Sequence, residues 1–200
     1  MDPELLRQID PKDFYEAHLK ENLRPDYRKV LTCRKLAISL KDNDTICMVR
    51  LGSTSVLLSL TEGSGFEGWS DLSHLGKATG KVRISILADD GNLLEAVSLG
   101  YQILIKKSDI LFPFTFCELF GYYIRDPTKE EEKMSQCTLT IFLSESGKIN
   151  IVKTQGSPIA LADVQKLVSN CQLWAARASQ KMPMLQANKT FIGKLYSSKS

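Results

Sequence analysis

The segment from Leu93 to Lys106 constrains the fold most, because a helix formed by it would have no polar face. Its apolar residues are distributed nearly all round: Leu94, Ala96, Val97, Leu99, Ile103 and Leu104. A helix of this kind is usually buried inside a protein. The rest of the chain must therefore cover it, and 200 residues with 43% apolar content are enough for one domain with a substantial core.

Short apolar runs before this helix predict β-strands. They cover Leu36–Leu40, Ile46–Leu51 and Ser55–Leu60, and turn-forming residues separate them, so we expect an antiparallel meander. Another strand is expected at Val82–Leu87. The stretch 61–80 is rich in glycine, serine and threonine, which predicts an irregular connection. Its apolar anchors are Phe66, Trp69 and Leu72.

Strands and a long helix are expected after the buried helix. Phe114–Ile124 predicts one long strand or a strand pair, and Cys137–Leu143 and Lys148–Lys153 predict two more. A stripe at helical spacing then predicts a long amphipathic helix against a sheet. The stripe consists of Leu161, Val164, Val168, Cys171, Ala175, Ala178 and Met182. We expect one domain over residues 1–182 and a flexible C-terminal tail over 183–200.

The beginning of the chain completes the order of elements. Asp10 and Pro11 are typical of a helix start, and Asp13 adds negative charge to the first turn, so a helix is expected to about Asn22. The order is then helix, strands, buried helix, strands, long helix, without a repeated strand–helix unit. This order favours an α+β domain over a doubly wound sheet.

The charge and the cysteines exclude several function classes. A formal net charge of +3 is too small for nucleic-acid binding driven by charge alone. The cysteines are odd in number and widely spaced, without a CxxC pair, which argues against a zinc site and a disulfide framework. No membrane span or signal peptide is evident, so we expect an intracellular protein.

Two groups of carboxylates require an interpretation. The first group is Asp126, Glu130, Glu131 and Glu132. It could hold a divalent ion or supply a base, but acidic residues after a proline more often complement a helix dipole, and we favour that interpretation. The second pair, Asp89 and Asp90, could be catalytic acids at a strand end. The following Gly91-Asn92 makes a tight turn the preferred explanation.

A basic group near the N-terminus could contact phosphates. It consists of Arg24, Arg28, Lys29, Arg34 and Lys35. Because acidic residues lie within the group and loop arginines often bind carbonyls, we favour a structural role. His18 is expected to be packed on the first helix, and His74 lies near no nucleophile signature, so no catalytic triad is predicted.

Four segments in register resemble RNase PH-type subunits of the eukaryotic RNA exosome. Residues 14–28 resemble the opening of these subunits, where a short helix leads into an Arg-x-Asp-Gly-Arg signature. Arg24, Asp26 and Arg28 match it, whereas Tyr27 replaces the glycine. Residues 49–54 resemble a turn between early strands, 90–96 a strand-to-helix turn, and 126–132 an acidic helix start. The resemblance covers most of residues 12–182.

The resemblance implies an RNase PH-like α+β domain with a mixed or antiparallel sheet, a buried helix and a long C-terminal helix. The stretch between Leu60 and Lys81 is much shorter than in the family, so part of the usual N-terminal half is expected to be missing. The catalytically inactive branch of the family is implied, without catalytic residues, cofactor or metal. The signature residues are then structural: Arg24, Asp26, Arg28, Asp90, Gly91, Asn92, Asp126 and Pro127.

The resemblance also implies partners and a location. The partners would be other RNase PH-type exosome subunits in a hetero-oligomeric ring, exosome cap proteins, and RNA within the assembled channel, with no membrane. The location would be the nucleus, including the nucleolus, and the cytoplasm. The missing segment should leave apolar surface and sheet edges exposed, which predicts dependence on a partner.

Two alternatives to a non-catalytic ring subunit stay open from the sequence. In active relatives the corresponding regions supply phosphate-binding arginines and an aspartate near the scissile bond. Asp89, Asp90 and Asp126 at element ends would fit a phosphate-dependent 3′→5′ exoribonuclease. The basic N-terminal group and the lysines of the tail would instead fit a stand-alone RNA-binding or regulatory module.

Overall fold

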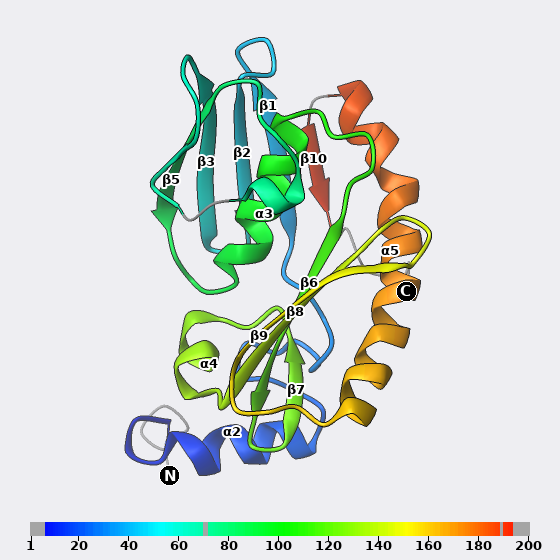
Figure 1. Ribbon diagram of the computed structural model, residues 1–200. Coiled ribbons are helices and arrows are strands. Elements are labelled where there is room, and N and C mark those ends of the chain that lie inside the picture. Colours follow the sequence, from blue (N-terminus) through cyan, green and yellow to red (C-terminus); the bar gives the residue numbers. More distant parts are fainter. Residues whose placement is uncertain (1–6, 70–71, 189, 194–200) are drawn as a thin grey trace.

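The computed structural model of the protein describes residues 7–69, 72–188 and 190–193, with the backbone alone over 183–188. The strands are β1 (Leu36–Lys41), β2 (Ile46–Leu51), β3 (Thr54–Thr61), β4 (Phe66–Glu67), β5 (Lys81–Ala88), β6 (Phe112–Leu119), β7 (Tyr122–Arg125), β8 (Cys137–Leu143), β9 (Ile149–Gly156) and β10 (Thr190–Gly193). They form a six-stranded sheet in the order β10-β1-β2-β3-β5-β4 and a four-stranded sheet in the order β7-β6-β8-β9 (Figure 1).

The helices are α2 (Pro11–Lys20), the 3-10 turn η1 (Ser73–Leu75), α3 (Leu93–Leu104), α4 (Lys129–Met134) and α5 (Leu161–Asn188). Figure 1 shows α3 against one face of the six-stranded sheet and α5 along the side of both sheets. The predicted start of α2 is confirmed, because the Asp10 side chain accepts a hydrogen bond from the Asp13 amide. The α+β class is confirmed as well. None of the helices in the described part of the chain is long and apolar enough to cross a membrane.

The predicted meander is confirmed by the pairing of the strands. β1 pairs antiparallel with β2, and β2 pairs antiparallel with β3. β3 then pairs antiparallel with β5, whereas the two-residue β4 runs parallel to β5 and makes the sheet mixed. The six-stranded sheet is therefore mixed, in agreement with the mixed or antiparallel sheet that the resemblance implies.

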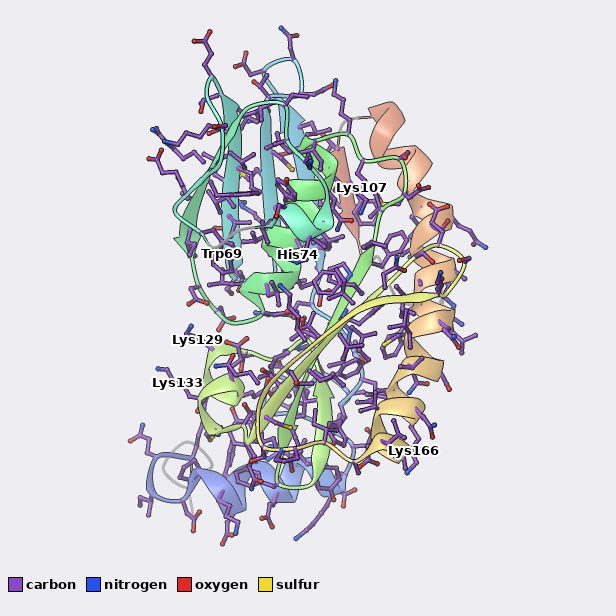
Figure 2. The ribbon with its side chains drawn as sticks, in the orientation of Figure 1. Trp69, His74, Lys107, Lys129, Lys133 and Lys166 are labelled. Carbon is purple, nitrogen blue, oxygen red and sulfur yellow. The ribbon has the colours of Figure 1, made fainter. Side chains whose placement is uncertain are left out.

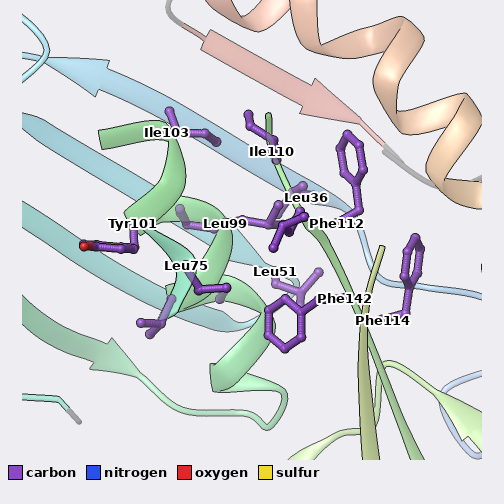
Figure 3. Close-up of a cluster of buried hydrophobic side chains, with 14 of the residues drawn as sticks. Leu36, Leu51, Leu75, Leu99, Tyr101, Ile103, Ile110, Phe112, Phe114 and Phe142 are labelled. Atoms are coloured by element: carbon purple, nitrogen blue, oxygen red, sulfur yellow. The ribbon is translucent and has the colours of Figure 1, made fainter. Parts of the chain in front are cut away.

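The helix α3 is buried, as its lack of a polar face predicts. Every residue from Glu95 to Leu104 is buried. The helix packs on β2 and β3 and also contacts β6, so one hydrophobic core joins both sheets. Figure 3 shows this core, with Leu99 and Ile103 on α3, Leu51 on β2 and Phe112 on β6 among its side chains.

The described residues of the glycine-rich stretch 61–80 contain more regular structure than the sequence suggests. It contains β4 and η1, and Leu72 and Leu75 are both completely buried in the core. Leu75 was not among the expected anchors. Beyond this stretch, β5 exposes Ile86 and also Leu87, which is 55% exposed, in line with the expected apolar surface.

The strand predicted at Cys137–Leu143 is present as β8. Leu139 to Leu143 are all buried, since β8 lies between β6 and β9 in its sheet and packs against α5. The expected domain boundary at residue 182 lies within α5, whose backbone continues to Asn188. β10 pairs antiparallel with β1 and occupies the outer edge of that strand. Residues 189 and 194–200 lie outside the described residues.

Candidate functional site

The signature segments meet in one buried charge network, and Asp126 lies at its centre. Its carboxylate is fully buried. It accepts hydrogen bonds from the backbone amide of Arg34 (2.7 Å), Arg34 Nη2 (2.9 Å), Arg28 Nη1 (3.1 Å) and Asn92 Nδ2 (2.7 Å). The N-terminal segment, the β5–α3 turn and the β7–α4 turn are therefore tied together through one side chain.

The electrostatics of Asp126 follow from these contacts. Burial by itself would raise the pKa of this carboxyl, because it disfavours the charged form. The hydrogen bonds and charge of Arg34, with the charges of Arg28 and Arg125, outweigh burial and lower the pKa to about 2. Asp126 is thus a stable anion that neutralises buried arginines. A carboxyl group with so low a pKa is a poor general base at neutral pH.

A second buried pair joins Arg24 to α4. Arg24 Nε donates to Glu131 Oε1 at 2.9 Å, and a second bond connects Arg24 Nη2 to Glu131 Oε2. Arg24 also donates to the carbonyls of Arg125 and Asp126. Glu131 and Thr128 form a capping box at the start of α4, as is common for an acidic residue in a first helical turn. The helix-start interpretation of the carboxylates is confirmed at this residue.

A third pair joins Arg125 to Glu95 with two hydrogen bonds of 2.7 Å, and both side chains are buried. The sequence analysis missed this pair. The sequence did indicate it, since Glu95 is the sole charged residue of α3 and Arg125 is the sole charged residue of β7. Isolated charges in buried segments require a partner.

The turn between β5 and α3 has the tight geometry expected of Asp-Gly-Asn. Gly91 and Asn92 have φ values of 83° and 56°, which belong to the left-handed region. The Asp89 side chain accepts from the Gly91 amide, and Thr54 Oγ1 donates to the Gly91 carbonyl. Asp89 and Asp90 thus lie at the tight turn that the sequence predicts.

The basic residues of the N-terminal group are largely committed to partners within the chain. Arg34 donates to the carbonyls of Asp90, Gly91 and Pro127, and Arg28 pairs with Asp26. Arg24, Arg28 and Arg34 thus have the carbonyl and carboxylate partners that a structural role predicts. Elsewhere, Lys81 and Arg83 both pair with Glu67.

A cavity of about 400 Å³ lies beside the start of α3. It is lined by Asn92, Leu94, Thr115, Glu132, Ser135, Gln136, Cys137, Thr138, Thr140, Gln155 and Gly156. Among these lining residues Glu132 carries the sole formal charge, and none is lysine or arginine. The sequence analysis did not find this site, because its lining comes from four separate segments.

A carboxylate lies beside the start of α3 at this cavity. Glu132 Oε1 accepts from the amide of Asn92, the N-cap residue of α3, at 2.7 Å, and negative charge is favourable near a helix N-terminus. Burial raises the pKa of Glu132. The neighbouring cation Lys129 is paired with Asp89, and Figure 2 shows Lys129 and Lys133 on the outer side of α4.

The histidines and cysteines are packed rather than grouped. His18 Nδ1 lies 2.8 Å from the Phe14 carbonyl, as expected for a packed histidine, and His74 stands edge-on to Phe142. Burial raises the pKa of Cys47 and Cys171 to about 12, so these thiols are poor nucleophiles. The described residues contain no cluster of histidine, cysteine and carboxylate side chains suited to a metal ion.

The fold is that of RNase PH-type proteins. Residues 109–170, which hold the four-stranded sheet and the beginning of α5, match domain 2 of the 3′ exoribonuclease family. The resemblance inferred from the motifs is thus confirmed for the fold, and this domain match supports it independently. No curated protein sequence matches the chain significantly.

Three solved structures share this fold over most of the chain. An archaeal exosome core has 20% identity and a TM-score of 0.64, with 84% of this chain and 94% of that chain covered. An Archaeoglobus fulgidus exosome with RNA bound to the active site has 19% identity and a TM-score of 0.64, with coverage of 89% and 99%. Rice (Oryza sativa) Rrp46 has 16% identity and a TM-score of 0.63, with coverage of 82% and 100%.

Proposed function

We propose that this chain is a non-catalytic structural subunit of an exosome-type ring that supports 3′-to-5′ RNA processing and degradation. The observation that carries the proposal is the cavity beside α3. Its lining contains no lysine or arginine, and the Glu132 carboxylate lies beside the start of α3, where its charge would oppose a phosphate.

Phosphorolysis needs a positively charged pocket, because inorganic phosphate must be held and the developing charge of the displaced ester must be stabilised. A carboxylate at the helix N-terminus would instead repel phosphate. The signature residues Arg24 and Arg28 and the nearby Arg34 are held by Glu131 and Asp126. These pairings argue against the alternative of a phosphate-dependent exoribonuclease and weaken that of an RNA-binding module.

The likeness to exosome structures and the exposed edges of the chain support the ring part of the proposal. β9 is an edge strand that exposes Ile149 and Val152, and β5 exposes Ile86 and Leu87. Exposed edges and apolar patches are typical of surfaces that a neighbour covers. The neighbours would be other RNase PH-type subunits, with cap proteins and a central RNA channel, in the nucleus, its nucleolus and the cytoplasm.

The test is assembly followed by activity. The purified chain, mixed with RNase PH-type subunits from the same cells, should enter a ring-sized complex in native mass measurements. Leu87→Asp on β5 should reduce entry, whereas Leu173→Asp, at an exposed leucine of α5, is the matched control. Failure of the unmodified chain to enter a ring would contradict the assembly part.

The activity test uses a complex in which this chain is the subunit under study. We expect no release of nucleoside diphosphates from RNA that depends on both phosphate and this chain. Phosphate-dependent release that is abolished by Asp90→Ala would refute the non-catalytic role, since Asp90 is one of the aspartates that suggested an enzyme.

A further inference from the structure

The loop that follows α2 presents an aromatic side chain on a strained backbone. Tyr27 has a φ of 62°, in the left-handed region, and it is 87% exposed. A bulky residue is destabilising in this conformation, because its Cβ lies too close to the following carbonyl oxygen. The part of the chain that the structure describes offers the Tyr27 side chain no hydrogen bond or ring contact that would offset the strain. A strained residue without internal contacts points to a role outside the fold.

The backbone of Tyr27 is held firmly by the residues on either side of it. The Tyr27 amide donates to the Arg24 carbonyl at 2.8 Å, and the Arg24 amide donates to the Arg28 carbonyl at 2.9 Å. The Arg24 side chain is paired with the buried Glu131. The Arg28 side chain is paired with the buried Asp126. The base of the loop is thus fixed by the charge network, and a tyrosine on such a base loses little conformational entropy when it binds a partner.

The other side chains of the loop indicate which kind of partner Tyr27 meets. Leu23 and Leu31 are each 39% exposed, so the loop offers aliphatic surface besides the aromatic ring. Both arginines within residues 21–32 are largely buried and paired with carboxylates, which leaves Lys29 as the one exposed cation of this segment. Nucleic acids are bound by cations that can reach several phosphates. An exposed tyrosine with aliphatic neighbours is instead typical of the centre of a protein–protein interface.

We propose that Tyr27 is an anchor residue whose ring inserts into an apolar pocket of a neighbouring RNase PH-type subunit. This inference rests on the proposed ring role and adds the residue through which one contact is made. Burial of the ring in the neighbour offsets the backbone strain that the isolated chain bears at this position. Leu23 and Leu31 add apolar area to the same contact and exclude water from it.

The anchor role is tested by assembling the full chain with purified RNase PH-type subunits from the same cells. The dissociation constant of the complex is measured for the unmodified chain and for Tyr27→Gly. Glycine adopts the left-handed conformation without strain, so the isolated variant should be at least as stable as the unmodified chain. Its dissociation constant should nevertheless rise roughly tenfold to a hundredfold.

Two results would overturn the anchor role, and they differ in what they say of the ring. Entry of the unmodified chain into a ring, with an unchanged dissociation constant for Tyr27→Gly, would refute the anchor role alone. Failure of the unmodified chain to enter a ring would contradict the proposed function as well.

Two further variants separate the tyrosine ring from other effects. Asn43→Gly makes the same kind of backbone change at an exposed residue between β1 and β2, where φ is 52°, and it should leave the dissociation constant unchanged. Tyr27→Phe keeps the ring and removes the hydroxyl, so its dissociation constant should stay within about threefold of that of the unmodified chain. A loss as large as that of Tyr27→Gly would contradict an apolar pocket.

The other possible occupant is a base of single-stranded RNA, since bases stack on exposed aromatic rings. This occupant is tested by titrating the unmodified full chain and Tyr27→Gly with a fluorescently labelled oligouridylate. We expect no difference between the two chains. Weaker RNA binding by Tyr27→Gly would assign the ring to base stacking and would overturn the proposal of a protein neighbour.

Discussion

Asp126→Asn is the substitution that tests the buried charge network most directly. The Asp126 carboxylate is the shared partner of Arg28 and Arg34, at 3.1 and 2.9 Å, and it is fully buried. Asparagine preserves the size of the side chain but removes the negative charge and turns an amide group toward donors. Breaking a buried pair by removing one partner costs about 3–5 kcal/mol. This loss is a large part of the ~5–15 kcal/mol that stabilises a typical domain.

The matched control is Asp90→Asn. Asp90 contacts the same arginine, with Arg34 Nη1 at 3.2 Å, but its side chain is 42% exposed. Ion pairs of this kind contribute about 0–1 kcal/mol, because water already solvates the charge. Urea unfolding at pH 7, followed by tryptophan fluorescence, should separate the two variants by several kcal/mol. Similar small losses for both would refute the view that Asp126 holds the network together.

The pH dependence of the same variant gives a second test. The pKa of Asp126 is lowered from 3.8 to about 2 in the folded chain. A depressed pKa contributes stability that is fully present above about pH 4 and is lost as pH falls toward 2. The difference corresponds to about 2 kcal/mol. The gap in unfolding free energy between the unmodified chain and Asp126→Asn should therefore narrow by about this amount between pH 4 and 2, and a constant gap would contradict the assignment.

Two backbone predictions follow from positive φ angles. Gly91→Ala would place a Cβ 2.5 Å from the Lys129 amide nitrogen and 2.5 Å from the Thr128 carbonyl carbon, so it should destabilise by more than about 2 kcal/mol in thermal unfolding. Gly121→Ala is the control, since its φ of 84° is similar and nothing lies within 4 Å of the added atom. Tyr27→Gly should stabilise the chain by up to about 1 kcal/mol in urea unfolding. Tyr27 is 87% exposed and has a φ of 62°, a left-handed conformation that glycine adopts without strain. A loss of stability would show that the Tyr27 side chain contributes to folding.

The elements that the sequence predicts well are those determined by residues close together in the chain. The meander depends on apolar runs separated by turns, and the burial of α3 on the absence of a polar face. The tight turn at Gly91 and the helix start at Asp10 depend on a few residues each. Local conformational preference and periodicity suffice in all these cases.

The features that the sequence does not predict depend on contacts between distant segments. The pairing of β10 with β1 joins residues about 150 positions apart, and no local pattern indicates it. The burial of both faces of β8 arises because other elements cover a strand whose own pattern alternates. The cavity is another example, since Asn92, Glu132 and Gln155 become neighbours only when the two sheets are joined.

The charge network explains why the motifs alone do not separate an enzyme from a silent relative. The motif side chains Arg24, Arg28 and Asp126 are buried or largely buried and bound to one another or to backbone carbonyls. Removing them would disturb folding whether or not the chain has an activity. Evidence on chemistry must therefore come from groups outside this network, such as the side chains that line the cavity beside α3. The activity of an assembled complex is thus a more direct test of function than any count of matching motifs.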